Sequence, residues 1–283
     1  MTIMDTVAAS LQMAVRTLQS HSDSPRLDAE ILLCKVLEVS RTTLIVRSEQ
    51  TIPDDSRQAY DELIARRVQG APIAYLTGSR EFWSLELTVT PDVLVPRAET
   101  ELVVELALAL CPLDQTRSVL DLGTGSGAIA LAIAADRPSA RITGVDVSAP
   151  ALSVAMQNSR KLELPRVQWR VGSWFDAVPG ERFDIIVANP PYVASDDPAL
   201  TKLAAEPFLA LASGPTGLEA LAAIVDRAAR HLNPRGWLLL EHGNTQAAQV
   251  AGMLGAQGFG EIRSHHDYSG KPRVTLGTIH SSL

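Results

Sequence analysis

Cysteine is scarce in this chain of 283 residues, because Cys34 and Cys111 are the only two. Two thiols cannot form a disulfide framework, and reduced thiols are typical of cytoplasmic proteins. Long apolar runs are also missing: the longest, Ala128 to Ala135, falls far short of the roughly 20 residues that a membrane-spanning helix needs. The N-terminus carries neither a basic nor an apolar segment, so it predicts no secretion signal. We therefore expect a cytoplasmic protein with no membrane partner.

Basic residues are too few to balance the acidic ones, with 25 Lys and Arg against 32 Asp and Glu. A net charge of −7 gives no general attraction to a polyanion, so a nucleic-acid partner would need a local basic patch. We therefore expect no direct nucleic-acid contact. His242, His265 and His266 have no partner at metal-ligand spacing, so we expect no metal.

Length and periodicity predict two domains joined by a linker. Residues 1–71 read as a helical domain, with Val7, Leu11 and Val15 at helical spacing, and Ser24 is placed as the N-cap of a helix that starts with Pro25. The period changes to two around residues 85–89, which predicts a β-hairpin within a linker over 72–98.

From residue 99 to 283, helix and strand patterns alternate. The predicted helices cover 101–110, 126–135, 148–161 and 217–231, and the predicted strands cover 118–121, 141–146, 183–188, 236–241 and 273–279. Such alternation predicts an α/β domain whose sheet carries helices on both faces.

A glycine-rich turn follows the first of these strands. It consists of Gly123, Thr124, Gly125, Ser126 and Gly127, and the next strand ends in Asp146, 19 residues after Gly127. A carboxylate there can accept hydrogen bonds from two ribose hydroxyls. The glycines also fit a dinucleotide fingerprint, so an NAD-dependent oxidoreductase is an alternative. Asp121 favours S-adenosylmethionine, because a carboxylate can pair with its amino group but would oppose a pyrophosphate.

The strand over 183–188 runs directly into Asn189, Pro190, Pro191 and Tyr192. Two prolines cannot continue a central strand, so the chain leaves the sheet at the edge that carries the glycine turn. The Asn189 side-chain oxygen and the Pro190 carbonyl can accept both N–H bonds of a planar amino group, and Tyr192 offers a face for stacking. This pattern predicts methylation of such a group. A non-catalytic, cofactor-sensing module is the alternative from another class.

These residues resemble the release-factor glutamine methyltransferase family of the class I S-adenosylmethionine-dependent methyltransferases. The resemblance lies in four segments: Pro72 to Gly78 with Glu81-Phe82-Trp83, Leu94 to Arg97 with Glu99-Thr100-Glu101, the glycine turn, and Asn189 to Tyr192. It implies a Rossmann-like sheet of seven strands, a small N-terminal helical domain that docks the substrate, and a β-hairpin linker.

The resemblance also implies a reaction and its residues. The reaction is methylation of N5 of the glutamine in the Gly-Gly-Gln motif of peptide-chain release factors, with S-adenosylhomocysteine as the other product. The cofactor residues carried over are Gly123, Thr124, Gly125, Ser126, Gly127, Asp146, Trp174 and Asn189, and the catalytic and substrate-binding residues are Asn189, Pro190, Pro191 and Tyr192. We expect the protein to act as a monomer. An N6-adenine-type methyltransferase acting on DNA or RNA is the alternative.

Three places depart from the family pattern, one of them the segment Lys202 to Ala205, which lacks the usual polar and aromatic residues. Ala98 stands where proline is usual, and Ser173 stands where an acid usually precedes the tryptophan. We expect the Ser173 hydroxyl or a backbone carbonyl to hold the adenine amino group in place of that acid.

Overall fold

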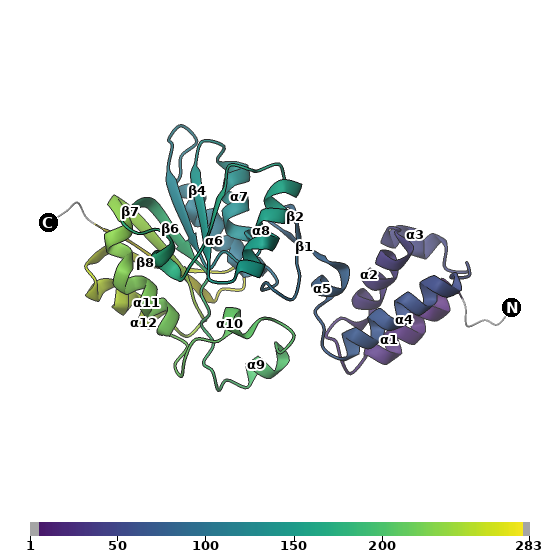
Figure 1. Ribbon diagram of the computed structural model, residues 1–283. Helices are drawn as coiled ribbons and strands as arrows, with labels where there is room; N and C mark the ends of the chain where they lie inside the picture. Colours follow the sequence, from purple (N-terminus) through teal and green to yellow (C-terminus); the bar gives the residue numbers. More distant parts are fainter. Residues whose placement is uncertain (1–5, 280–283) are drawn as a thin grey trace. The chain divides into compact units, whose positions relative to one another are not determined.

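The computed structural model describes residues 6–279, and the chain divides into two compact units, Met1–Ser79 and Arg80–Leu283. The first unit is helical (Figure 1): α1 (Val7–Leu18), α2 (Pro25–Leu37), α3 (Arg41–Val46), α4 (Asp54–Val68) and α5 (Ile73–Thr77). Its core contains Leu18, Leu32 and Tyr60, and the Tyr60 hydroxyl donates to the Ala29 carbonyl at 3.0 Å. The apolar spacing predicted this helical unit. The predicted boundaries at residues 71 and 98 stay predictions.

Ser24 precedes α2 as expected, but its side chain does not cap the helix. The Ser24 hydroxyl instead donates to Asp28 Oδ1 at 3.1 Å, and Asp28 Oδ2 accepts from Arg67 Nε of α4 at 2.8 Å. The prediction that Ser24 is the N-cap residue of this helix is therefore confirmed, although its hydroxyl bonds the Asp28 carboxylate rather than a backbone N–H of the first turn.

The second unit opens with a two-stranded hairpin, β1 (Ser79–Phe82) and β2 (Leu85–Thr88). Trp83 and Ser84 between them both have positive φ, of 53° and 58°, as a tight hairpin turn requires. Asn158, fully buried in α8 (Ala149–Lys161), holds the end of this hairpin. Its Oδ1 accepts from Thr88 N at 2.7 Å, and its Nδ2 donates to the carbonyls of Thr88 and Ser126, both at 3.0 Å. One side chain thus joins the hairpin to the glycine turn.

The main sheet has seven strands in the order β5-β4-β3-β6-β7-β9-β8. They are β3 (Ser118–Leu122), β4 (Arg141–Asp146), β5 (Gln168–Val171), β6 (Phe183–Ala188), β7 (Leu232–Glu241), β8 (Phe259–His266) and β9 (Pro272–Ile279). All pairings are parallel except those of β9, which runs antiparallel to both neighbours. This is the sheet that the family resemblance implied.

Helices cover both faces of this sheet, as the alternating pattern predicted. Side chains of α6 (Glu101–Ala109) and α7 (Ala128–Asp136) form one apolar cluster with Val119 of β3. Side chains of α11 (Glu219–Ala228) and α12 (Ala247–Ala256) form the cluster on the other face with Leu120 and Leu122. Within residues 6–279, we find no helix with the length and apolarity that crossing a membrane requires.

The sequence prediction missed β5, β8 and α12. The short helices α9 (Ala199–Lys202) and α10 (Phe208–Leu211) and the 3₁₀ turns η2 (Ala98–Thr100), η3 (Trp174–Ala177) and η4 (Ala229–His231) were not predicted as separate elements either. Both missed strands lie at the sheet's edges and carry polar residues, so they lack the apolar runs of central strands. The predicted strand over 236–241 starts earlier, at Leu232, and the helix predicted over 217–231 covers Glu219–Ala228 before η4.

Candidate functional site

The sheet brings three sequence signals to one edge. β3 lies between β4 and β6 and is parallel to both, so the carboxyl ends of the three strands face the same way. The glycine turn follows β3, Asp146 ends β4, and Asn189 follows β6. Strand order reverses at this place, which is where open α/β sheets bind their ligands.

A pocket of about 330 Å³ opens at this edge. Of the predicted site residues, it is lined by Gly123, Thr124, Gly125, Ser126, Asp146, Trp174, Asn189 and Pro191, and not by Gly127, Pro190 or Tyr192. Thr100, from a segment that matched the family but without an assigned role, also lines it, as do Val147, Ser148 and Leu209, which sequence reasoning did not single out. Within residues 6–279, no group of three or more His, Cys, Asp or Glu side chains is placed to hold a metal ion.

The glycine turn forms a cradle on one side of the pocket. The backbone N–H groups of Gly123 and Thr124 donate to the Val145 carbonyl at 2.8 and 3.0 Å, which ties the turn to β4. Gly125 has a φ of +56°, and a Cβ there would meet no atom within 4 Å, so a ligand can approach its backbone closely. A Cβ on Gly127 would lie 2.8 Å from the Trp169 ring, so Gly127 serves helix packing rather than the pocket.

Asp146 stands at the centre of the pocket wall. Its Oδ2 accepts from Gly125 N at 2.8 Å, and its Oδ1 accepts from Ser148 N at 2.9 Å. Burial raises the pKa of this carboxyl, while the backbone N–H groups of Ser148 and Gly125 act to lower it. Each carboxylate oxygen can accept a second hydrogen bond, so both remain able to bind a ribose hydroxyl.

Trp174 follows β5 with a φ of 47°, and its ring lies 3.4 Å from the place where a Cβ of Gly123 would stand. Ser173 and the half-exposed Val147 line the same end of the pocket. The Trp174 ring with the Ser173 hydroxyl, next to the Asp146 carboxylate and the glycine turn, fits a nucleoside that carries a short charged tail. These residues therefore fit S-adenosylmethionine.

Asp121 does not line the pocket, although the sequence suggested that it pairs with the cofactor's amino group. The side chain is fully buried, and burial raises its pKa to about 7. Its Oδ2 accepts from Thr124 Oγ1 at 2.6 Å. Asp121 therefore reaches the pocket only through Thr124, which it holds in place.

Asn189 is held at the pocket by Thr100. Asn189 Nδ2 donates to Thr100 Oγ1 at 3.1 Å, and Thr100 itself is buried and lines the pocket. In the described part of the chain, no hydrogen bond is made to Asn189 Oδ1 or to the Pro190 carbonyl oxygen. Both acceptors are thus available at the end of β6.

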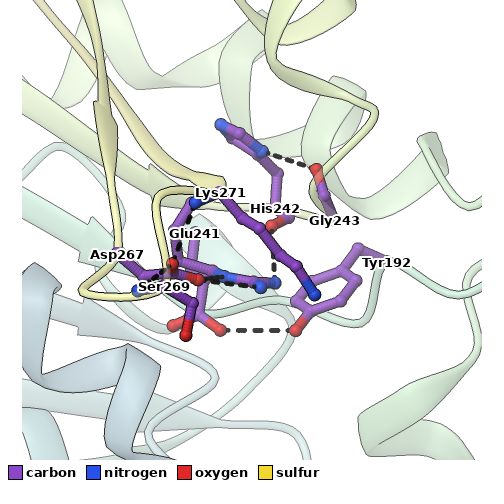
Figure 2. A network of polar contacts seen from close by, with 8 residues as sticks. Tyr192, Glu241, His242, Gly243, Asp267, Ser269 and Lys271 are labelled. Atoms are coloured by element: carbon purple, nitrogen blue, oxygen red, sulfur yellow. Dashed lines mark hydrogen bonds and ion pairs between the residues drawn. The ribbon is translucent and has the colours of Figure 1, made fainter.

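Tyr192 turns toward the end of β7 instead of lining the pocket. Its hydroxyl donates to Glu241 Oε1 at 3.3 Å (Figure 2), and its carbonyl accepts from Gln246 Nε2 at 3.1 Å. A Cβ on Gly217 would lie 2.4 Å from the same carbonyl. Contacts outside the pocket, with Glu241 and Gln246, therefore hold both the side chain and the backbone of Tyr192.

Glu241 is the fully buried carboxyl at the end of β7. Burial raises its pKa to about 7, against a hydrogen bond from Thr100 and the positive charge of Arg273, which lower it. Arg273 in turn donates to Asp267 Oδ2 at 3.2 Å, and Asp267 lies near Glu241 in Figure 2. The sequence signal for Glu241 was its position at the end of the strand predicted over 236–241.

Glu206 ties together two segments that border the pocket. It accepts from Val95 N at 3.1 Å and pairs with Arg97, while its own side chain is 3% exposed. Pro207, Leu209 and Ala210, which follow it, line the pocket opposite the glycine turn. The family resemblance marked the segment Leu94 to Arg97 in the sequence, but not its contact with Glu206.

Known proteins match the chain along most of its length. Residues 9–78 match the family model of the PrmC N-terminal domain, and residues 100–264 match that of the methyltransferase small domain. The release factor glutamine methyltransferase of Salmonella typhimurium is 45% identical over 94% of this chain and 96% of its own length. That of Pseudomonas aeruginosa is 46% identical over 90% and 93%. The crystal structure of a methyltransferase from Pyrococcus furiosus, 18% identical, has the same fold, with a TM-score of 0.53 over 69% of this chain and 89% of that one.

Proposed function

The chain belongs to the family of release factor glutamine methyltransferases, and we propose that it methylates N5 of the glutamine in the Gly-Gly-Gln motif of peptide-chain release factors. Its methyl donor is S-adenosylmethionine. One observation supports a planar amide as the methylated group. The side-chain nitrogen of Asn189 is hydrogen-bonded to Thr100, which leaves its side-chain oxygen available beside the cofactor pocket.

The available acceptors match the donors of a primary amide. Asn189 Oδ1 and the Pro190 carbonyl oxygen would each accept one N–H of the glutamine side chain. The two prolines fix the backbone torsions that place the Pro190 carbonyl, so the pair of acceptors is rigid before substrate binds. With both N–H bonds directed at the protein, the face of the amide nitrogen turns toward the pocket.

Orientation is the main contribution that this chain makes to the reaction. An amide nitrogen is a weak nucleophile because its lone pair is delocalised into the carbonyl group. Hydrogen bonds from both N–H groups to fixed oxygens raise the electron density on the nitrogen and hold it in line with the methyl group. No nucleophilic side chain is needed for a direct displacement.

The cofactor residues of the proposal are Gly123, Thr124, Gly125, Ser126, Asp146, Trp174 and Asn189, while Gly127 supports the turn by close packing. When bound, S-adenosylmethionine supplies an electrophilic methyl group on a sulfonium. Asp146 would accept the ribose hydroxyls, Gly125 would allow the tail of the cofactor to approach the backbone, and Trp174 would flank it. Ser173, at the same end of the pocket, would bond the adenine amino group.

We further propose that the N-terminal helices dock the release factor, with domains over 1–71 and 99–283 and a linker over 72–98. The protein would act as a monomer in the cytoplasm, without direct contact to nucleic acid. The acidic net charge of −7 supports the last point.

The decisive experiment is transfer of labelled methyl from S-adenosylmethionine to purified, unmodified release factor, with duplex DNA and total RNA in parallel tubes. Peptide mass spectrometry would locate the label on the Gly-Gly-Gln glutamine. Asn189→Ala is expected to lose most of this transfer and little cofactor affinity, which calorimetry measures separately.

Other results would contradict the proposal. Label found only in nucleic acid would refute the substrate while leaving the cofactor in place. Cofactor binding with no transfer to any of these substrates would favour the non-catalytic module. Equal losses of activity and cofactor affinity in Asn189→Ala would make Asn189 chiefly a cofactor residue.

A further inference from the structure

The side-chain amide of Asn189 has to present one particular end to the substrate. Its oxygen can accept an N–H of a glutamine amide, whereas its NH2 group would face another donor. The two ends of an amide are nearly equal in size, so packing alone does not select between them. The selection has to come from hydrogen-bond partners within the protein.

Thr100 is the partner in direct contact, since its Oγ1 accepts from Asn189 Nδ2 at 3.1 Å. A hydroxyl can both donate and accept, so Thr100 alone would bond equally well to either end of the amide. The direction of the Thr100 proton therefore decides which end of Asn189 faces the pocket.

Glu241 determines that direction. The register of β6 and β7 pairs Ala188 with Leu240, so the next residues, Asn189 and Glu241, leave the sheet side by side. Glu241 Oε1 accepts from Tyr192, and Glu241 Oε2 is buried with no hydrogen-bond partner in the described part of the chain. Thr100, which bonds the neighbouring Asn189, therefore lies next to a buried carboxylate oxygen that still needs a donor, and its hydroxyl acts to lower the pKa of this carboxyl.

We propose that Glu241 is a positioning residue that acts through Thr100 to fix the Asn189 amide with its oxygen toward the substrate. An ionised carboxylate only accepts hydrogen bonds, so the Thr100 proton points to Glu241. The lone pairs of Thr100 are then left for Asn189 Nδ2, and Asn189 Oδ1 faces the pocket. The inference rests on the proposed function, because it concerns the group that holds the substrate amide.

The surroundings of Glu241 hold the carboxylate in place. Arg273 supplies a positive charge beside it and is itself fixed by Asp267, whose Oδ1 accepts from the backbone N–H groups of Ser269 and Lys271 (Figure 2). The Tyr192 hydroxyl binds Oε1 from the other side. We call the chain of contacts from Glu241 through Thr100 to Asn189 the relay. Its first acceptor, the Glu241 carboxylate, is thus held in a fixed position.

The variant Glu241→Gln tests the direction of the relay with little change in volume. A glutamine can accept from Tyr192 with its oxygen and donate to Thr100 with its nitrogen. Thr100 would then donate to Asn189, and the amide of Asn189 would turn its NH2 group toward the substrate. The expected result is a fall in kcat of about tenfold or more, with the dissociation constant of S-adenosylmethionine changed less than about threefold.

Two variants of Thr100 separate the hydroxyl from the shape of the side chain. Thr100→Val keeps the shape and removes the relay, so kcat is expected to fall by about 10- to 100-fold. Thr100→Ser keeps the hydroxyl and is expected to retain kcat within about threefold. The double variant with Glu241→Gln should be no slower than Thr100→Val alone, because both changes break one relay. All assays use release factor as substrate at about pH 8.5, where Glu241 is ionised.

Thr278→Val is the matched control. Thr278 is also a buried threonine, whose Oγ1 donates to the Gly236 carbonyl at 2.9 Å and more weakly to the Ile279 carbonyl at 3.4 Å, but it does not line the pocket. It is expected to lower the melting temperature as Thr100→Val does and to leave kcat unchanged. The comparison separates a loss of stability from a loss of orientation.

Three outcomes would overturn the inference. The first is a kcat equal to that of the wild type in Thr100→Val or Glu241→Gln. The second is a fall in kcat of the double variant that equals the product of the two single falls. The third is a loss of cofactor affinity in these variants without a fall in kcat. In each of these cases wild-type protein still methylates the glutamine, so the proposed function stands. If the wild-type protein itself transfers no methyl to release factor, the proposed function fails and this inference falls with it.

Discussion

The buried side chain of Asn158 joins the hairpin to the glycine turn by three hydrogen bonds. The effect of its replacement on the free energy of unfolding can therefore be estimated. Asn158→Leu keeps the volume and removes all three hydrogen bonds. Thr88 N–H and the carbonyls of Thr88 and Ser126 would lose these partners, next to the fully buried position 158 and the buried Ser126, with Thr88 itself half-buried. Each unpaired buried group costs about 1–3 kcal/mol, so the free energy of unfolding should fall by about 3 kcal/mol or more.

The assay for this change is urea unfolding followed by tryptophan fluorescence. All four tryptophans, at positions 83, 169, 174 and 237, lie in the second unit, so the signal reports on the unit that contains Asn158. Cofactor affinity should fall as well, because the Ser126 carbonyl is part of the glycine turn that lines the pocket. Calorimetry with S-adenosylmethionine measures that loss.

Ser153→Ala is the control on the same helix. Ser153 is exposed, and its hydroxyl donates only to the Ala149 carbonyl, so the change in unfolding free energy should stay within about 0.5 kcal/mol. A loss below about 1 kcal/mol in Asn158→Leu would refute the reasoning, since even one unpaired buried group should cost that much.

Three further changes have expected outcomes. Gly144→Ala would place a Cβ 2.5 Å from the Trp169 ring, and thermal unfolding should show a loss of about 1–3 kcal/mol. Arg97→Met would leave the buried Glu206 without its charged partner, so KM for S-adenosylmethionine should rise while Arg97→Lys preserves part of the affinity. Burial raises the pKa of Glu241 from 4.5 to about 7, so between these values the folded state holds a proton that the unfolded chain has lost. The free energy of unfolding should therefore fall as pH rises through this range, and denaturation of Glu241→Gln at several pH values should show a smaller fall.

The central part of the fold was predictable because its signals are local. The strand over 183–188 is a continuous apolar run that ends at prolines, and the glycine turn follows directly on β3. β5 and β8 were not predictable in the same way, since edge strands do not need two apolar faces. Their place in the sheet depends on pairing with β4 and β9, which a local pattern does not encode.

Asp121 shows why a residue's proximity to a motif was not enough to place it. Side chains alternate along a strand, and Leu120 and Leu122 pack into the cluster of α11 and α12. Asp121 therefore points to the opposite face, together with Val119, and lies beneath Thr124. The sequence showed an acid next to the glycine turn, but which face it took depended on how the helices cover the sheet.

The contact between Thr100 and Asn189 was also beyond sequence reasoning, although both residues stood in recognisable segments. They are far apart along the chain, and so are Asn189 and Glu241. The strand register brings Asn189 beside Glu241, and that register follows from the strand order. Once the order of β6 and β7 is known, the pairing of their ends follows.

Two carboxylates at opposite ends of neighbouring strands have pKa values that are shifted in opposite directions. Asp184, near the amino end of β6, accepts from Ser118 N at 2.7 Å and from Asn233 Nδ2 at 2.9 Å. Burial alone would raise its pKa, but these hydrogen bonds, with that of the Ser118 hydroxyl and the charge of Arg117, lower it, so the charge stabilises the fold. Glu241, at the carboxyl end of the neighbouring strand, has a raised pKa and a buried oxygen with no hydrogen-bond partner among the described residues. An apolar residue there would avoid the cost of a buried charge, but it could not direct the proton of Thr100. The unfavourable carboxylate stands at the edge where the methyl group is transferred, and orientation of Asn189 is the property that it supplies there.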